Sequence, residues 1–78
     1  MYGLTTLIEF PNSDDPKLEG MELFDSAEAA VSKANKLLKV FIDEYGEDIT
    51  QRATTKNLFA MGFNGEVTWR AYISEIKA

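Results

Sequence analysis

The chain of 78 residues carries a net charge of −5, with 45% hydrophobic and 27% charged residues, which is the composition of a folded protein with room for one domain. It contains neither cysteine nor histidine, which excludes disulfides, thiolate metal sites, a nucleophilic thiol and the usual general base at neutral pH. Small domains without such supports often gain stability from oligomerisation or from a larger partner.

Acidic residues are concentrated near the N-terminus, because residues 1–28 hold seven of the 13 acidic side chains and a single lysine. This charge repels the phosphates of duplex nucleic acid and permits a basic protein partner. No apolar run approaches the roughly 18 residues of a membrane span, and the first residues lack the basic region of a signal peptide. We therefore expect no membrane contact and a cytoplasmic location.

Residues 2–10 alternate between two sets of side chains and are rich in β-branched and aromatic residues, which predicts a strand. The cluster of turn-forming residues at 11–16 ends this strand. Residues 21–24 predict a short second strand, joined to the first by a long polar loop.

A long helix is predicted to begin after Asp25, whose carboxylate can cap the first turn together with Glu28 in a capping box. Gly46 supplies the left-handed residue that ends the helix. Between these points apolar residues recur at helical spacing and form a stripe that can lie across a sheet: Ala27, Ala30, Val31, Ala34, Leu37, Leu38, Phe41, Ile42 and Tyr45.

The dipeptide Asn64-Gly65 lies between two apolar runs, which predicts a β-hairpin with a two-residue turn in which Phe63 faces Glu66. One face of this hairpin has no charged residue. It is predicted to pack on the helix stripe and consists of Leu58, Ala60, Gly62, Val67, Trp69, Ala71 and Ile73.

Residues 47–56 have no clear pattern. They form either a loop or an extension of the third strand, in which Ala53 would pair with Ile76. The predicted fold is a single α+β domain over residues 1–78, a small antiparallel sheet of three to four strands with one long helix packed on one face, in the order β(β)αββ.

The second face of the hairpin is also apolar, although a protein of this size usually buries only one face of a sheet. Apolar patches mark interfaces, where aromatic residues, Met and Arg are enriched. Three occupants are open: a cover formed by residues 47–56 or by the N-terminal loop, a second copy of the chain, or a different protein. The predicted protein-interface residues are Phe59, Met61, Phe63, Arg70 and Tyr72, which share this face with Thr68.

Alternate aromatic residues beside an Arg on a sheet also suit base stacking on single-stranded nucleic acid. The basic start of an RNA-recognition strand is missing from residues 58–63, and this end of the chain is only slightly basic. Nucleic acid is therefore the disfavoured partner.

Four carboxylates in six residues surround the predicted end of the helix, where the macrodipole favours cations instead. We interpret them as a weak docking point for Lys or Arg on a partner, against the simpler interpretation of a solvated helix terminus. No calcium-loop pattern is present, so no metal and no cofactor are predicted. The four residues are Asp43, Glu44, Glu47 and Asp48.

The sequence contains no nucleophile elbow, P-loop or dinucleotide fingerprint, and without His or Cys an enzyme would depend on carboxylates, Lys or a Ser activated by Lys. The leading hypothesis is a non-enzymatic protein–protein interaction module, for example a small acidic inhibitor or adaptor that docks a basic partner surface. The alternatives are a single-stranded nucleic-acid binder on the aromatic hairpin face and a structural homodimer subunit.

Overall fold

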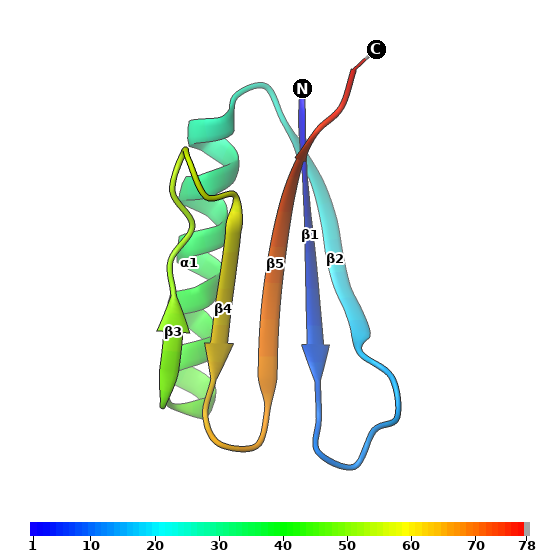
Figure 1. Cartoon of the computed structure of the whole chain (residues 1–78), viewed down its shortest axis with the longest axis vertical. Coiled ribbons are helices and arrows are strands. Elements are labelled where there is room, and N and C mark those ends of the chain that lie inside the picture. Colours follow the sequence, from blue (N-terminus) through cyan, green and yellow to red (C-terminus); the bar gives the residue numbers. More distant parts are fainter. Residues whose placement is uncertain (78) are drawn as a thin grey trace.

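The computed structural model describes residues 1–77, which form a five-stranded antiparallel sheet with one helix on one of its faces (Figure 1). The order of the strands across the sheet is β2-β1-β5-β4-β3. This confirms the predicted α+β class with a helix on one face, but the sheet has one or two strands more than predicted. The elements are β1 (Tyr2–Glu9), β2 (Lys17–Phe24), α1 (Ala27–Tyr45), β3 (Ile49–Gln51), β4 (Phe59–Phe63) and β5 (Thr68–Glu75).

The difference in strand number comes from the two edges of the sheet. β3 is a three-residue strand within residues 47–56, too short to leave a periodic pattern. β2 begins at Lys17 rather than at Met21, and a bulge interrupts its pairing, since Thr6 pairs with Gly20 whereas Leu7 pairs with Leu18. A bulge puts two successive residues opposite one, so it breaks the alternation by which a strand is recognised in a sequence.

The first and last strands lie side by side at the middle of the sheet. β1 pairs with β5 along its whole length, from Tyr2 opposite Glu75 to Glu9 opposite Thr68. The N–H of Ile76 donates to the carbonyl of Met1 at 2.8 Å. The predicted pairing of Ile76 with Ala53 is wrong, because β4 begins only at Phe59 and Ala53 is hydrogen-bonded to the side chain of Asn35 instead.

The turn between β4 and β5 has four residues instead of the predicted two, because Phe63 pairs with Thr68 and not with Glu66. The Asn64 side-chain oxygen accepts hydrogen bonds from the N–H groups of Glu66 at 2.8 Å and Val67 at 2.7 Å. Gly65 alone adopts a positive φ in this turn, at 98°. The correction shifts the register by two residues, and because side chains alternate with period two, the composition of both faces is as predicted.

Asn64 also joins the hairpin to the helix, since its amide Nδ2 donates to the carbonyl of Tyr45 at 3.0 Å. We expect Asn64→Ala to lower the free energy of unfolding by about 1–3 kcal/mol, because it removes three hydrogen bonds and leaves backbone groups unpaired. Asn64→Asp is the matched control. It retains both acceptor bonds of the turn and loses only the donation to the helix, so its loss should be smaller. Urea unfolding measures both, and an alanine variant as stable as the native chain would contradict the proposed role of this side chain.

The helix begins one residue later than predicted. Ser26, not Asp25, is the N-cap, because its hydroxyl accepts from the N–H of Ala29 at 3.2 Å while its own backbone is extended. Asp25 and Ser26 are both good caps, and the sequence alone does not decide between neighbours. The predicted end is confirmed, since Gly46 has a φ of 85° and donates its N–H to Ile42 at 2.8 Å.

The helix stripe packs on the charge-free hairpin face, as predicted, with Ala30, Ala34, Leu38 and Phe41 buried on the helix. Trp69 is 2% exposed at the centre of this core. Its ring lies 6.4 Å from that of Phe41, and its indole N–H donates to the Glu19 carboxylate at 2.9 Å. The bulge in β2 brings Glu19 to this side of the sheet, so the one polar atom of the buried ring has a partner.

Candidate interaction face

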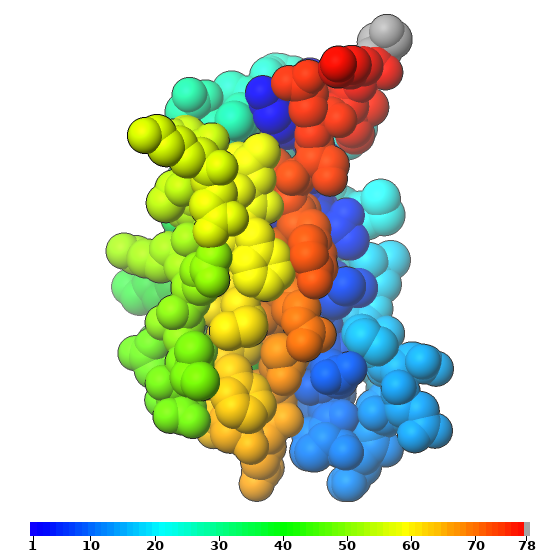
Figure 2. Space-filling view, in the orientation of Figure 1, coloured from blue at the N-terminus to red at the C-terminus, as the bar shows by residue number. Residues whose placement is uncertain are grey.

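The candidate site is the face of the sheet opposite α1, here called the outer face. In Figure 1 the helix lies behind the sheet, and Figure 2 shows the outer face, where the five strands lie side by side and no other segment of residues 1–77 crosses them. A two-layer domain buries one face of its sheet, so this face is the one that needs a partner if it is apolar.

Residues 47–56 do not cover the outer face. β3 extends the sheet beside β4, with Ile49 opposite Phe63. The chain then turns to the helix side, where Ala53 is 3% exposed and its N–H and C=O bond to the side-chain amide of Asn35 at 2.9 and 3.0 Å. The loop of residues 11–16 lies beyond the ends of β1 and β2 (Figure 1). Among the described residues, neither predicted form of intramolecular cover is present.

Strand pairing arranges the outward side chains in rows across the sheet. Each row contains residues from three to five strands, and neighbours within a row are direct cross-strand partners. From β2 towards β3, the rows are Leu23, Gly3, Ser74; then Met21, Thr5, Tyr72, Phe59; then Leu18, Leu7, Arg70, Met61, Gln51; and last Glu9, Thr68, Phe63, Ile49.

The structure brings all five predicted interface residues together on this face. Phe59, Met61, Phe63 and Arg70 are half-buried by their neighbours, and Tyr72 is 43% exposed. The rings of Phe59 and Tyr72 are direct partners with centroids 5.2 Å apart. They form a continuous aromatic surface across β4 and β5.

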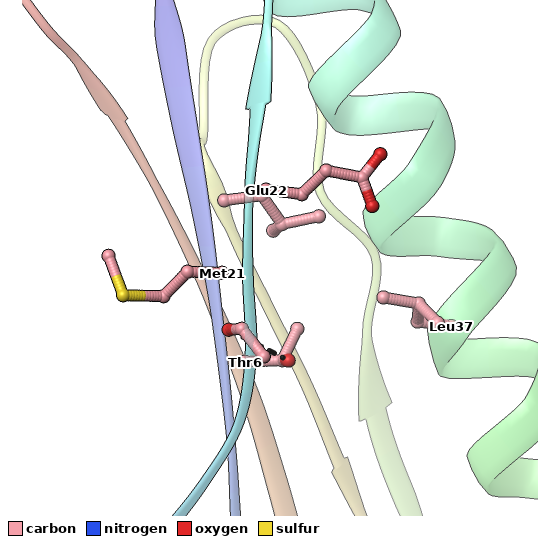
Figure 3. Close-up of a pocket in the computed structure, with 6 residues that line it drawn as sticks. Thr6, Met21, Glu22 and Leu37 are labelled. Carbon is pink, nitrogen blue, oxygen red and sulfur yellow. Dashed lines mark hydrogen bonds between the residues drawn. The ribbon is translucent and has the colours of Figure 1, made fainter.

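β1 and β2 contribute half of the outer face, and this half was not predicted from the sequence. Leu18, Met21 and Leu23 are 59%, 75% and 60% exposed, and Ile49 on β3 is 54% exposed. Figure 3 shows that Met21 and Glu22 leave β2 in opposite directions, with Glu22 on the side of the helix. Alternation could have identified Met21 and Leu23 as one face, but the bulge hides their relation to Leu18.

An open apolar groove lies at one end of the outer face, beside the last residues of the chain. Its volume is about 440 Å³, and Met21, Leu23 and Ile76 line it together with Gly3, Thr5 and Ser74. Gly3 forms part of the groove without a side chain. A Cβ at this position would crowd the side chain of Ile76, since it would lie 3.0 Å from Cδ1. This volume suits one large apolar side chain of a partner.

A second, smaller cavity lies on the other face, between β2 and the helix (Figure 3). Its volume is about 90 Å³, and Thr6 at its wall donates its hydroxyl hydrogen to the carbonyl of Gly20 at 3.4 Å. Ligand pockets usually measure about 300–1,000 Å³, so this gap between packed layers is too small to be one.

The predicted acidic group lies away from the outer face. Asp43 and Glu44 belong to the last turns of α1, Glu47 and Asp48 to the connection that follows, and all four are exposed. Glu47 accepts a hydrogen bond from the Thr50 hydroxyl at 3.1 Å. Within residues 1–77, no cluster of three His, Cys, Asp or Glu residues has a geometry that could hold a metal ion.

Tyr2, the first residue of β1, is partly buried and makes a side-chain hydrogen bond across the sheet. Its hydroxyl donates to the Glu75 carboxylate at 3.1 Å, and this hydrogen bond, with the negative charge of Glu75, raises the pKa of Tyr2 above its usual value. The phenol is the donor of a hydrogen bond that joins β1 to β5.

The single helix of the described chain lacks the length of apolar sequence that a membrane span requires.

Three comparisons were made, with protein-family models, with curated proteins and with solved structures, and none found a match to this chain. A function for the chain is therefore inferred from the geometry of the outer face and the charges around it.

Proposed function

We propose that this chain is a non-enzymatic protein-interaction module that binds its partner through the outer face. The observation that carries the proposal is the uncovered sheet, on whose outward face aromatic, aliphatic and Met side chains outnumber the polar ones and surround Arg70. Monomeric soluble proteins rarely leave so continuous an apolar surface to solvent. Aromatic and Arg residues are also the side chains that contribute most of the affinity at interfaces.

The dimensions of the outer face support this proposal. The Cα atoms span 38 by 22 Å when the molecule is viewed onto the sheet, and the domain is only 17 Å deep. Each partner in a standard interface buries roughly 800 Å², which a face of these dimensions can supply. Small domains commonly add to their stability through such a contact.

The test is capture of binding proteins from the native host on the immobilised chain, with Phe59→Asp as the variant. We expect the variant to lose the captured protein while its far-UV circular dichroism is unchanged. Equal capture by the native chain and by a folded variant would overturn the proposal, because the bound protein would then contact another surface.

A second candidate function, a small acidic inhibitor or adaptor that docks a basic surface, draws on the exposed carboxylates at the end of α1. We expect Asp43→Lys with Glu44→Lys to weaken a basic protein partner about tenfold, because rim charges mainly change long-range attraction. The same variant should bind single-stranded nucleic acid more tightly if the aromatic pair Phe59 and Tyr72 is a stacking platform. Titration against both ligands at two salt concentrations distinguishes these functions, since the two effects have opposite signs.

A further inference from the structure

The outer face carries two charged side chains among its strand residues, and they have opposite signs. Arg70 lies on β5 opposite Leu7, and Glu9 lies on β1 opposite Thr68. The two residues are therefore diagonal neighbours, which lie roughly 7–8 Å apart in an antiparallel pair. The face is electrically neutral although the chain has a net charge of −5, because the other acidic residues lie on the helix, in the loops or on the inner side.

We propose that the outer face binds a second copy of this chain about a two-fold axis, with Arg70 of each copy paired with Glu9 of the other. This inference rests on the proposed function and names the partner. A two-fold interface is self-complementary, so a face that supplies both members of an ion pair can form two identical pairs at once. Apolar neighbours around both charges exclude water, which strengthens such a pair.

The registers fix where the axis must lie. It runs in the plane between the two sheets and passes midway between Arg70 and Glu9, so that each charge falls over its opposite. Leu18 lies in the row of Arg70, and Phe63 lies in the row of Glu9 on the opposite side of the sheet. The diagonal from Leu18 to Phe63 therefore follows the axis, and both residues meet their own counterparts. Because this axis is oblique to the strands, the strands of one sheet cross those of the other at a large angle, as in orthogonal sheet packing.

Edge-to-edge pairing through β2 is the competing way to join two copies. β2 is an exposed edge of eight residues, but it carries the bulge at Glu19 and the charges of Lys17 and Glu22. Bulges and charged residues are the devices by which natural edge strands avoid pairing. The face-to-face arrangement is therefore the one that the structure favours.

Single cysteines test the position of the axis, because the native chain has none. Leu18→Cys and Leu23→Cys form a matched pair on β2, since both leucines point outward and are 59% and 60% exposed. Facing sheets pack about 10 Å apart, so a short bismaleimide is a better probe than a direct disulfide. We expect Leu18→Cys to form a covalent dimer rapidly and Leu23→Cys, two rows from the axis, not to be cross-linked. Equal rates for the two variants would overturn the proposed axis.

Charge exchange tests the pairing itself, with sedimentation equilibrium as the measurement. We expect Arg70→Glu to raise the dimer dissociation constant by about tenfold or more, and the double variant Arg70→Glu, Glu9→Arg to restore it. Arg70→Gln, without a reversed charge, should lie between the two. Circular dichroism confirms that each variant is folded.

Three results would overturn the second copy as the occupant. One is a native chain that stays monomeric at millimolar concentration, and another is a dimer whose dissociation constant Arg70→Glu leaves unchanged. The third is a dimer that only substitutions on β2 disrupt, which would indicate edge pairing. A monomer that still loses its captured host protein on Phe59→Asp would leave the proposed function intact with a different protein as partner.

Discussion

Substitution of Gly62 by alanine is expected to lower the free energy of unfolding by about 1–3 kcal/mol, although it adds a single methyl group. A Cβ at this position would lie 2.7 and 2.9 Å from two ring carbons of Phe41 and 3.0 Å from Cδ1 of Leu38. The Phe41 ring cannot retreat, because it is 3% exposed and lies between the rings of Tyr45 at 5.2 Å and Trp69 at 6.4 Å. The helix would have to move away from β4.

Gly20→Ala is the matched control for this effect. The nearest atom to a Cβ at Gly20 is the Thr6 hydroxyl oxygen at 3.8 Å, an ordinary contact, and its φ is not positive. The substitution should therefore be neutral or stabilise the strand by up to about 1 kcal/mol, because it restricts the unfolded chain. Urea unfolding followed by Trp69 fluorescence measures both variants. Equal stability of the two variants would show that the packing of α1 on β4 does not require a glycine at position 62.

The faces of the C-terminal hairpin could be predicted without its correct register. The turn was predicted with two residues and has four, which moves every partner by two positions. Side chains in a strand alternate with period two, so an error of two leaves Ala60 inside and Phe59 outside. An error of one would have exchanged the core and the surface.

The turn itself depends on a side-chain interaction that a dipeptide pattern does not specify. Asn-Gly favours a two-residue turn when both residues adopt positive φ. Here the Asn64 side chain caps two backbone N–H groups and also reaches Tyr45 at the end of the helix. That contact joins residues 19 positions apart in the chain, so local sequence could not reveal it.

The extent of the outer face could not be predicted because it depends on which strands become neighbours. The pairing of β1 with β5 joins residues at opposite ends of the chain, and no turn signal connects them. This pairing adds the leucines and Met21 of the N-terminal hairpin to the aromatic patch of the C-terminal one. The position of residues 47–56 also depends on long-range contacts. The hydrogen bonds between Asn35 and Ala53 hold this segment on the helix side, away from the patch.

Phe59→Asp and Ala60→Asp are expected to have opposite consequences, although the two residues are neighbours in β4. Ala60 is fully buried beneath the helix, so a carboxylate there has no water and no cationic partner. We expect Ala60→Asp to cost roughly 4 kcal/mol or more, a large share of the stability of a small domain. Phe59 faces outward and is half-exposed, so Phe59→Asp should cost only about 1 kcal/mol through the lost contact with the Tyr72 ring.

Partner binding should nevertheless weaken strongly in Phe59→Asp, although this variant stays folded. An aspartate at position 59 places an unpaired charge in the aromatic centre of the interface, where loss of an anchor side chain typically costs about 2 kcal/mol or more. Urea unfolding and partner titration on the same two variants separate the effects, since Ala60→Asp should unfold and Phe59→Asp should stay folded but bind at least about thirtyfold more weakly. If Phe59→Asp unfolds as readily as Ala60→Asp, then Phe59 belongs to a core and the outer face is not an interface. If it stays folded and binds normally, the partner contacts another part of the molecule, and the exposed carboxylates at the end of α1 become the first surface to test.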